Sequence, residues 1–516
     1  MIINDLKLPV GYTEEMMEKA IFRAAGKRFK IHSVRILRRS IDARKKPQLF
    51  YVMKVAVNEK ADPGFQVPKL NADVASKKVA VIGSGPAGLF AAKALSEAGA
   101  CVTVFERGKP VEERTCDVQG FFNGKPLDPE SNIQFGEGGA GTFSDGKLNT
   151  RVKDTDGLNA YVLGTFSEAC GDESILYDAN AHIGTDLLPD VIKNIRESLK
   201  ANGVIFRFST KMTGLLSEDQ QVTGICFKRT DIPDAREETE AFSAVILAVG
   251  HSARDTFRML KDSGIPMEKK AFAVGVRIEH PQEMITLSQY GSLDYEELGP
   301  APYHLSARAK NGRGVYSFCM CPGGQVVNAS SEKGRLVING MSDHRRSGKN
   351  ANAGIVVQVT EADFPGEDVL SGMHFQEQLE EKAYQALQGK IPVQLLKDFY
   401  ADEVSTSFGE VTPDFCGDYG IAKLSDILPP PVVEALKDGI HDFGKKIEGF
   451  DREDAVLSAV EARTSSPVRI LRNEAFESAL EGLYPAGEGA GYAGGIVSAA
   501  MDGVRTACAL VRKWNQ

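Results

Sequence analysis

Apolar residues in the first 57 positions fall into short runs that predict a small α/β unit. The runs at Ile2–Leu8, Ile31–Ile41 and Leu49–Val57 have the length and pattern of strands. Thr13–Ala25 has apolar residues at helical spacing behind a threonine that suits a helix N-terminus. Asn58–Ser76 combines prolines, a glycine and scattered charges, and it predicts a linker.

The pattern changes at Lys77. Strand-like and helical stretches alternate from there to about Gly264, which is typical of a parallel α/β sheet. After Ala271 the apolar runs become successive strands with Gly-rich turns, which predict an antiparallel sheet followed by a helix. These elements are expected at Phe272–Ile278, Gly314–Cys321, Gln325–Ala329, Leu336–Met341, Ile355–Thr360 and, for the helix, Phe375–Leu387. Leu480–Val511 returns to a Gly-rich strand-turn-helix pattern.

We therefore expect an α/β fold with an antiparallel β insertion, arranged in four segments. Residues 1–70 are assigned to a small N-terminal α+β domain and its linker, and 71–265 to the first part of a Rossmann-like domain. Residues 266–400 are assigned to an antiparallel substrate or cap domain, and 401–516 to the segment that returns to the Rossmann-like domain.

Composition marks an ordinary globular protein and limits its partners. Apolar residues make up 42% and charged residues 25% of the 516, and the net charge is −9. An acidic chain is an improbable nucleic-acid binder as a whole. The stretch from Arg23 to Lys46 is the exception, with ten basic residues and one acid. It either docks RNA or an acidic protein, or is a solvated or self-docking face, and the acidic remainder of the chain favours the second interpretation.

The eight cysteines lack regular spacing, which indicates a reducing compartment. The N-terminus shows no signal-peptide pattern, and no run of ~18 apolar residues occurs. We expect a cytoplasmic protein without membrane contact. Glycine is the unusual count, at 51 residues, which is above the usual share of about 7%.

Three of these glycines lie in a dinucleotide-binding fingerprint. The apolar strand Lys78–Ile82 is followed by Gly83-Ser84-Gly85-Pro86-Ala87-Gly88, a helix, the strand Cys101–Phe105 and Glu106. Such a turn lets the backbone approach a pyrophosphate at a helix N-terminus. Glu106 is placed to accept hydrogen bonds from a ribose diol.

Two further segments distinguish FAD from NAD. Gly487–Ile496 places Glu488 and a Gly-rich turn before a C-terminal helix, as flavoproteins with two dinucleotide-binding domains do, although the usual acid there is Asp. The helix N-terminus would stabilise negative charge on a reduced flavin. Ala244–Gly250 matches a Gly-ended re-entry strand, and Met212 is a candidate adenine neighbour. FAD is the predicted cofactor, with NAD alone as the alternative.

The whole chain resembles a bacterial family of uncharacterised FAD-dependent dehydrogenases, the NAD(FAD)-utilising type. The strings that carry the resemblance are Gly83–Gly88 with Glu106–Gly108, Phe135–Leu148, Val274–Pro281, Glu461–Ile470 and Gly487–Ile496. The resemblance implies the fold and the flavin but no substrate.

The candidate site residues follow from these segments. The cofactor-binding set is Gly83, Ser84, Gly85, Pro86, Ala87, Gly88, Glu106, Arg107, Arg114, Gly138, Gly139, Ala140, Lys147, Met212, Gly250, Gly487, Glu488, Gly494, Gly495 and Ile496. The catalytic candidates are Lys147, as a cation near the flavin N5/N1 region, and Arg463, as a fork for an anionic substrate group. The alternative for Lys147 is a place in a surface loop, and the alternative for Arg463 is a salt bridge. Arg277 has the same two interpretations as Arg463.

Other side chains are expected to be structural. Cys319 and Cys321 are interpreted as two buried reduced thiols, because a C-x-C bridge would be strained. His182, His251, His280 and His441 are expected to be surface or hinge residues, and no metal-binding spacing occurs. The sequence contains no second fingerprint for NAD(P)H. NAD(P)H would therefore act as a transient electron donor, or a redox partner would take its place.

The resulting functional prediction is an FAD-dependent oxidoreductase that transfers a hydride between a small substrate and FAD. The alternative is a flavin-binding interaction or RNA-associated protein without steady turnover.

Overall fold

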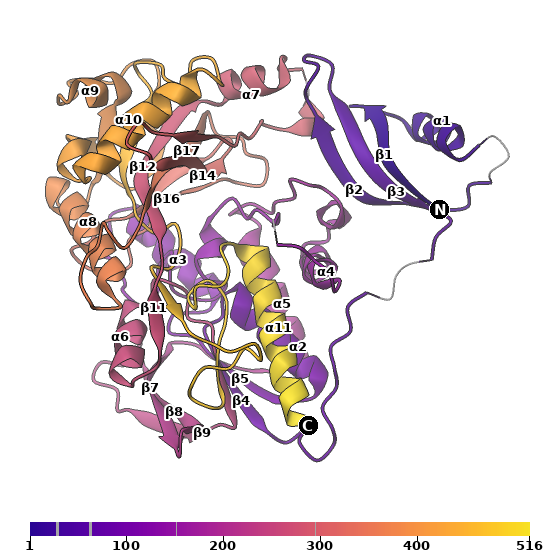
Figure 1. The fold of residues 1–516 in the computed structure, drawn as a ribbon, viewed down its shortest axis with the longest axis vertical. Helices are drawn as coiled ribbons and strands as arrows, with labels where there is room; N and C mark the ends of the chain where they lie inside the picture. Colours follow the sequence, from indigo (N-terminus) through magenta and orange to yellow (C-terminus); the bar gives the residue numbers. More distant parts are fainter. Residues whose placement is uncertain (27–29, 61–63, 151, 295) are drawn as a thin grey trace.

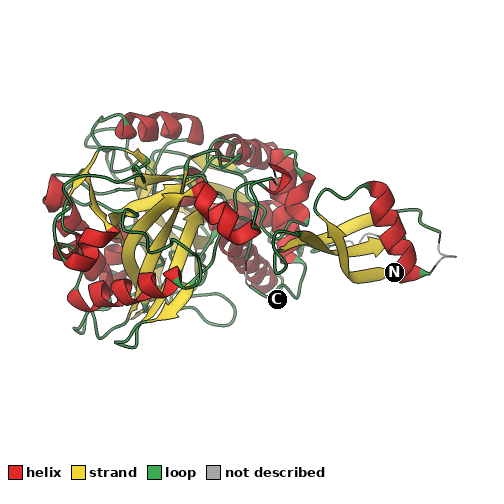
Figure 2. Ribbon diagram, turned by 90° about the horizontal axis from the view of Figure 1, so that it is seen from above, coloured by secondary structure: helices red, strands yellow, loops and turns green. Residues whose placement is uncertain are grey.

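The computed structural model describes residues 1–26, 30–60, 64–150, 152–294 and 296–516. The N-terminal unit is a three-stranded antiparallel sheet in the order β1-β3-β2, made by β1 (Ile2–Pro9), β2 (Val34–Asp42) and β3 (Phe50–Val57). Helix α1 (Glu14–Ala25) packs on it, and the Thr13 hydroxyl accepts from the Met16 N–H at its start. The unit projects to one side of the molecule (Figures 1 and 2).

The second layer is a five-stranded parallel sheet in the order β23-β10-β4-β5-β6. Its strands are β4 (Lys78–Ile82), β5 (Cys101–Phe105), β6 (Ile205–Arg207), β10 (Ala244–Leu247) and β23 (Leu483–Pro485). The chain leaves β4 for β5 on one side and later places β10 on the other. The carboxyl ends of β4 and β10 therefore form the switch point at which such sheets bind ligands.

Helices α2 (Pro86–Ala98) and α11 (Ile496–Trp514) pack closely against each other on this sheet. Two glycines permit close packing here, Gly88 between α2 and the turn after β4, and Gly503 between α11 and α2. A Cβ at Gly88 would lie 1.9 Å from the Gly83 carbonyl oxygen, and one at Gly503 would lie 2.1 Å from the Ala87 carbonyl oxygen. Both helices therefore begin at the same edge of the sheet, near its switch point. The long-range return of the C-terminal helix to the fingerprint helix is visible in Figure 1.

A large, mainly antiparallel sheet lies above this domain, in the order β13-β14-β17-β12-β21-β18-β20, in which the β18–β20 pair is parallel. Its strands are β12 (Phe272–Pro281), β13 (Ser306–Arg308), β14 (Gly314–Cys321), β17 (Asn350–Val359), β18 (Ile391–Leu395), β20 (Tyr419–Ile421) and β21 (Val456–Glu461). The sequence boundary at residue 400 is therefore wrong for this sheet. β20 and β21 are hydrogen-bonded members of it, so residues 401–461 belong with the cap and not with the returning segment.

Smaller sheets complete the fold. A meander of β7 (Thr210–Glu218), β8 (Gln221–Arg229) and β9 (Glu238–Ala241) extends from the Rossmann-like domain. The others are β16-β15-β19, made by β15 (Gln325–Asn328), β16 (Ile338–Met341) and β19 (Phe415–Cys416), and the pair β11 (Met267–Lys269) with β22 (Val468–Ile470).

The remaining helices surround these sheets. They are α3 (Val111–Phe122), α4 (Leu158–Cys170), α5 (Leu188–Ala201), α6 (Arg254–Asp262), α7 (Gln282–Tyr290), α8 (Ser371–Leu387), α9 (Leu396–Ala401) and α10 (Pro430–Gly444). Short 3-10 turns lie at Ala140–Phe143, Glu173–Leu176, Glu296–Leu298 and Leu424–Asp426. Within the described residues, no helix has the length and apolar character needed to cross a bilayer.

The predicted elements and the observed ones agree in type. The structure extends several of them, since α2 begins at Pro86 and β17 begins at Asn350. No helix or strand lies in the described part of the predicted linker, and three residues of that linker, 61–63, fall outside the described residues.

Candidate functional site

A cavity of about 1300 Å³ opens between the Rossmann-like sheet and the large antiparallel sheet. Its floor includes the carboxyl ends of β4 and β10, at Ile82–Gly83 and Ala248–Ala253. Its opposite wall comes from β14 and β16. Ligand pockets commonly measure ~300–1,000 Å³. This cavity therefore has room for a large cofactor together with a small molecule.

The predicted cofactor residues separate into two groups. Those that line the cavity are Gly83, Gly85, Pro86, Ala87, Glu106, Arg107, Gly139, Ala140, Lys147, Met212, Gly250, Glu488, Gly494, Gly495 and Ile496. Ser84, Gly88, Arg114, Gly138 and Gly487 lie behind this wall and support it. The structure thus gathers around one space segments that lie as far apart in the sequence as Gly83 and Ile496.

The fingerprint turn is held open by Glu106. Its Oε2 accepts from the Ser84 N–H at 3.0 Å and from the Ser84 hydroxyl at 2.8 Å. Its Oε1 accepts from the N–H groups of Gly108 and Gly136. The sequence analysis expected this carboxylate to face a ribose diol. The structure shows that its main partners are the two Gly-rich turns, so it braces the cofactor loops while lining the cavity.

Arg114 has a different role from the predicted cofactor contact. Its guanidinium is fully buried, and it donates to the backbone carbonyls of Asn132, Ile133, Glu137 and Gly139. Burial lowers the pKa of Arg114 to about 10. The side chain therefore fixes the path of the 132–139 loop from behind, where no ligand reaches it.

The adenine-side candidates also lie on the cavity wall. Met212 is buried on β7, at the cavity edge. Arg107 lies 4.1 Å from the Phe135 ring centroid and binds Glu130 and both oxygens of Asp255. Its guanidinium is thus held flat against the wall by two carboxylates and an aromatic ring.

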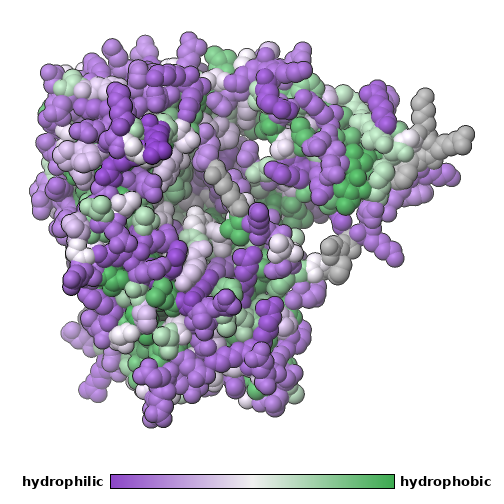
Figure 3. Space-filling model, viewed as in Figure 1, coloured by the Kyte–Doolittle hydropathy of each residue, from purple (hydrophilic) through white to green (hydrophobic). Residues whose placement is uncertain are grey.

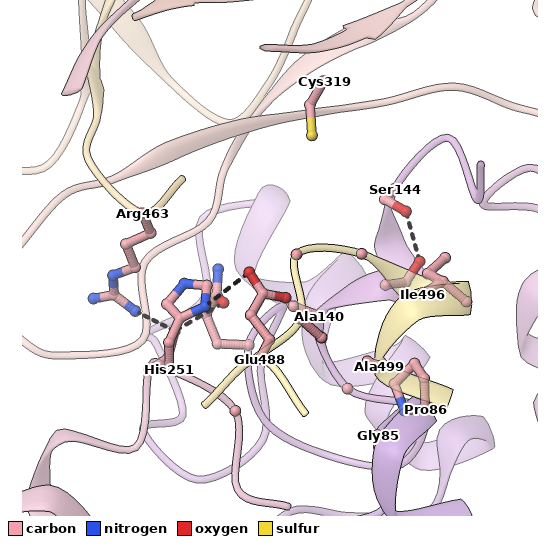
Figure 4. Close-up of a pocket in the computed structure, with 18 of the residues that line it drawn as sticks. Gly85, Pro86, Ala140, Ser144, His251, Cys319, Arg463, Glu488, Ile496 and Ala499 are labelled. Atoms are coloured by element: carbon pink, nitrogen blue, oxygen red, sulfur yellow. Dashed lines mark hydrogen bonds and ion pairs between the residues drawn. The ribbon is translucent and has the colours of Figure 1, made fainter. Parts of the chain in front are cut away.

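The C-terminal Gly-rich turn brings Glu488 beside His251 (Figure 4). The His251 Nδ1 lies 3.3 Å from the Glu488 Oε1, and the buried His251 Nε2 has no hydrogen-bond partner among the described residues. A Cβ at Gly494 would meet nothing within 4 Å, so the α11 N-terminus faces open space in the cavity. The expectation that His251 is a surface or hinge residue is therefore wrong, because it lines the site.

Lys147 lines the cavity and belongs to a group of charged side chains. Its ammonium is 2.8 Å from the Asp145 Oδ2 and also donates to the Met320 carbonyl. Arg346 binds the same carboxylate with two hydrogen bonds, at 2.9 and 2.7 Å. Burial raises the pKa of Asp145, but the two cations outweigh it and the net shift is downward. Asp145 is thus ionised and shared by two cations.

Arg463 contradicts its sequence assignment as a fork for substrate. Its Nε and Nη2 bind the two oxygens of Glu380 at 2.8 Å each, and its Nη1 donates to Ser252 and Ser331. Glu380 is fully buried and also binds Arg254, and these two arginines hold its pKa down, to about 2, against the effect of burial. The guanidinium of Arg463 therefore forms a salt bridge within the protein, as in the alternative interpretation. Its partner, Glu380, lies on α8. Arg277 likewise pairs with the buried Glu461 at 2.8 Å.

The two cysteines of β14 differ from each other. Cys321 is buried, whereas Cys319 exposes its side chain on the cavity wall and has a φ of 40°, at an irregularity in the β14–β17 register. Both are free thiols. The prediction of two buried thiols is therefore wrong for Cys319. The bulge turns its side chain out of the strand alternation and toward the cavity, as Figure 4 shows. Its depth in the molecule raises the thiol pKa to about 12.

The other predicted histidines are also placed by the structure. His280 is fully buried, and burial lowers its pKa to about 4, so it is not a surface residue. His182 stacks on His344, with 5.4 Å between ring centroids, and His441 is exposed. In the described residues no group of three or more His, Cys, Asp or Glu side chains is arranged to hold a metal ion.

Sequence reasoning missed Arg346, Asn339 and His251 as cavity residues. Asp145 was visible inside the Gly-rich string 135–148, but its partner Arg346 lies 201 positions away and has no motif around it. His251 follows Gly250 directly, so its place after the re-entry strand was the available signal.

The residues present fit FAD. The N-termini of α2 and α11 both reach the cavity, where their N–H groups and dipoles suit anionic oxygens. Gly85 and Gly139 form a cradle that a side chain would fill, because a Cβ on Gly139 would lie 3.1 Å from the Gly85 Cα. The unpartnered Nε2 of His251 adds a polar contact on the same wall. The fold and this site together define a flavoprotein.

Comparisons with known proteins agree. Residues 271–464 match a family described as "FAD-dependent protein, C-terminal domain-like", residues 81–111 match an NAD(P)-binding Rossmann-like domain, and residues 1–58 match a domain of unknown function. An uncharacterised protein of Clostridium beijerinckii is 44% identical over 99% of both chains. The chain belongs to the same family, a family of FAD-dependent proteins, and FAD is its cofactor. The sequence predictions of family, fold class and cofactor are confirmed.

Solved structures show more distant likenesses. The flavin-dependent brominase Bmp2 is 13% identical, covering 84% of this chain and 79% of its own, with a TM-score of 0.38. Glycine oxidase from Bacillus cereus is 11% identical over 85% of this chain and 95% of its own, with a TM-score of 0.36. E. coli quinol fumarate reductase FrdA is 12% identical over 85% and 70%, with a TM-score of 0.35. These values are too low to indicate a reaction.

Proposed function

We propose that this protein is an FAD-dependent oxidoreductase that acts on a small substrate bound between the FAD and the β14–β16 wall. The observation that carries the proposal is the lining of the cavity described above. Its lining joins the glycine turns and Lys147 of the Rossmann-like domain to polar side chains of the cap, including Cys319 and Asn339. A protein that only stored a flavin would not need this polar second wall.

Different residues of the chain would bind the cofactor and orient the substrate. Gly83, Gly85 and the first residues of α11 would hold the cofactor, with Glu106 keeping the first turn open. Bound FAD would supply two-electron chemistry by accepting or giving a hydride at its ring. The Lys147–Asp145–Arg346 group places fixed positive charge on the wall, where it can orient a substrate and stabilise negative charge.

The class of electron partner is inferred from the number of dinucleotide fingerprints in the sequence. The sequence has one dinucleotide fingerprint, which FAD uses. NAD(P)H would therefore bind transiently at the same cavity, or a redox partner would act instead.

In the N-terminal unit, Arg39 binds Asp178 with two hydrogen bonds, and Lys46 donates to the Ser288 carbonyl. These contacts support the self-docking interpretation of the basic stretch over RNA binding.

An anaerobic screen of reductants and acceptors tests the proposal. Purified protein with bound FAD is mixed with NADH, NADPH and panels of small alcohols, amines and acids, and the flavin absorbance is followed. Bleaching by one compound and recovery with an acceptor is the expected result. If no physiological reductant bleaches a flavin that dithionite reduces, the flavin-holding alternative replaces the enzyme.

A further inference from the structure

One wall of the cavity, where Asp145 and Lys147 meet Arg346 of the cap, has an excess of positive charge. Asp145 is matched by two cations, Lys147 and Arg346, so the group has an excess of one positive charge. Glu461 is the other carboxylate of this wall, and the Arg277 guanidinium already binds it at 2.8 Å. Both carboxylates are therefore neutralised from within the protein.

Several donors remain for a ligand. The ammonium of Lys147 has three N–H donors, and its acceptors among the described residues are Asp145 and the Met320 carbonyl. Arg346 uses Nε and Nη2 on Asp145, and its Nη1 has no acceptor in the described parts of the chain. Both side chains line the cavity, and Lys147 is 31% exposed there.

Asn339 adds a neutral donor to the same wall. Its Oδ1 accepts from the Arg277 Nη2 at 2.9 Å and from the Gly340 N–H at 2.8 Å, which fixes the orientation of the amide. With the oxygen turned to these donors, the Nδ2 is left with no acceptor among the described residues. Asn339 lines the cavity, so the amide presents N–H to it.

We propose that this corner is the substrate-recognition site and that it takes an anionic oxygen group, a carboxylate or a phosphate, of the small substrate. This inference rests on the proposed function, because it names the substrate class of the same cavity. The Lys147 Nζ and the Arg346 Nη2 both lie within 2.8 Å of one oxygen, the Asp145 Oδ2, so the two cations are neighbours at one corner of the cavity. Cationic donors of this kind bind oxyanions roughly twice as strongly as neutral donors do. A neutral substrate would leave the excess charge unmatched.

The test measures binding by the FAD-loaded protein. Acetate, succinate and benzoate are titrated against the matched amides acetamide, succinamide and benzamide, with inorganic phosphate as a separate arm, and the flavin spectrum reports occupancy. We expect at least one anion to bind saturably and its neutral analogue to bind at least about tenfold more weakly. A response to phosphate alone assigns the phosphate form, and a response to the carboxylates assigns the carboxylate form.

Variants locate the site. Lys147→Met and Arg346→Gln should each weaken anion binding about tenfold or more, Lys147→Arg should retain it, and the exposed Lys153→Met should change nothing. If Arg346→Gln does not fold because Asp145 loses its partner, Lys147→Met decides. Equal binding of anions and amides would overturn the proposal. So would a Lys147→Met protein with altered flavin absorbance but unchanged anion affinity, because Lys147 would then face the flavin.

Failure of this inference and failure of the proposed function give different results. If the flavin is bleached and reoxidised normally but the protein binds no anion, only the proposed anion site is contradicted. If the protein binds anions at this corner but no physiological reductant bleaches its flavin, the oxidoreductase proposal is contradicted and the anion site is retained.

Discussion

Buried carboxylates have opposite protonation behaviour in different parts of this chain. Glu380 and Glu279 are both inaccessible to solvent. Glu380 has two arginine partners and stays ionised, whereas the partners of Glu279 are the Asn350 amide and the Asp414 N–H, which do not offset burial. Burial therefore raises the pKa of Glu279 to about 8.

The raised pKa of Glu279 has a consequence for stability. In the unfolded chain a glutamate titrates near pH 4.5, so the folded state binds the extra proton between about pH 4.5 and 8. Its stabilising contribution is complete below that window and is lost as the pH rises through it. Glu279→Gln keeps the acceptor oxygen and removes the titration. We expect it to gain stability over the wild type between pH 5 and 8, on the order of 1–4 kcal/mol, in urea unfolding. Parallel pH profiles would contradict this.

The Glu380 network predicts the effect of breaking a buried ion pair. Glu380→Gln leaves Arg254 and Arg463 buried, with Glu332 as their remaining carboxylate. Removal of one partner from such a cluster costs about 3–5 kcal/mol. Thermal and urea unfolding should show a loss of this size. A loss below about 1 kcal/mol would mean that the arginines find water or other partners. Replacement of the half-exposed Glu381, which pairs with Arg335, by Gln is the control on the same helix.

At the scale of elements, two helix N-termini and the ends of two strands build the cofactor side of the cavity. α11 begins after Gly494 and Gly495, and α2 begins after the fingerprint turn. Helix N-termini have free N–H groups and partial positive charge, which anions and reduced flavins match. Gly88 lets α2 pack closely on the turn after β4, and Gly503 lets α11 pack closely on α2, so both helices keep this position.

Gly494→Ala tests this helix start. The backbone of Gly494 is not in the left-handed region, and a Cβ there would touch no protein atom, so folding should be unaffected. The methyl group would enter the cavity at the α11 N-terminus. We expect about tenfold weaker FAD binding, measured by dialysis and fluorescence of the released flavin. Gly164→Ala, where a Cβ also meets nothing within 4 Å, is the matched control and should retain FAD. Equal FAD affinity of the two variants would contradict the assignment.

The elements were largely predictable from sequence, whereas the wall opposite the cofactor was not. The run Lys78–Ile82 and the Gly turn predict a strand and a helix start from local pattern alone, whereas the contacts of Glu106 with the two Gly-rich turns were not predicted. Arg346 and Arg463 could not be placed in this way, because their roles depend on Asp145 and Glu380, which are brought near by the sheet topology. Cys319 faces the cavity because of a strand irregularity that the alternation of β14 does not reveal.

At the scale of the whole molecule, the N-terminal unit connects the two walls of the cavity. The Arg39 N–H donates to the Tyr177 carbonyl, and its guanidinium binds Asp178, just before the cavity residue Asn180. On the other side, Leu49 packs with Tyr290 and Ala301, next to the cavity residue Pro302. Figure 3 shows the surface hollowed between this unit and the main body.

This connection predicts a long-range effect of Arg39. Arg39→Met should raise amide hydrogen exchange over residues 177–183, because the bidentate contact with Asp178 is lost. His182 in that segment is bridged to Lys147, so a weakening of anion binding by a factor of a few is expected with it. Arg38→Met is the control, because Arg38 is exposed on β2 beside Lys54. Unchanged exchange in residues 177–183 would show that the N-terminal unit does not brace this wall.

The measurement that tests the account most directly is an experimental structure of the protein with FAD and the tightest-binding small anion. We predict one FAD per chain in the cavity of about 1300 Å³, with its diphosphate at the Gly83–Gly85 turn and the anion against Lys147 and Arg346. FAD bound outside this cavity would contradict the account. So would a flavin ring that fills the Lys147–Arg346 corner and leaves no space for a substrate.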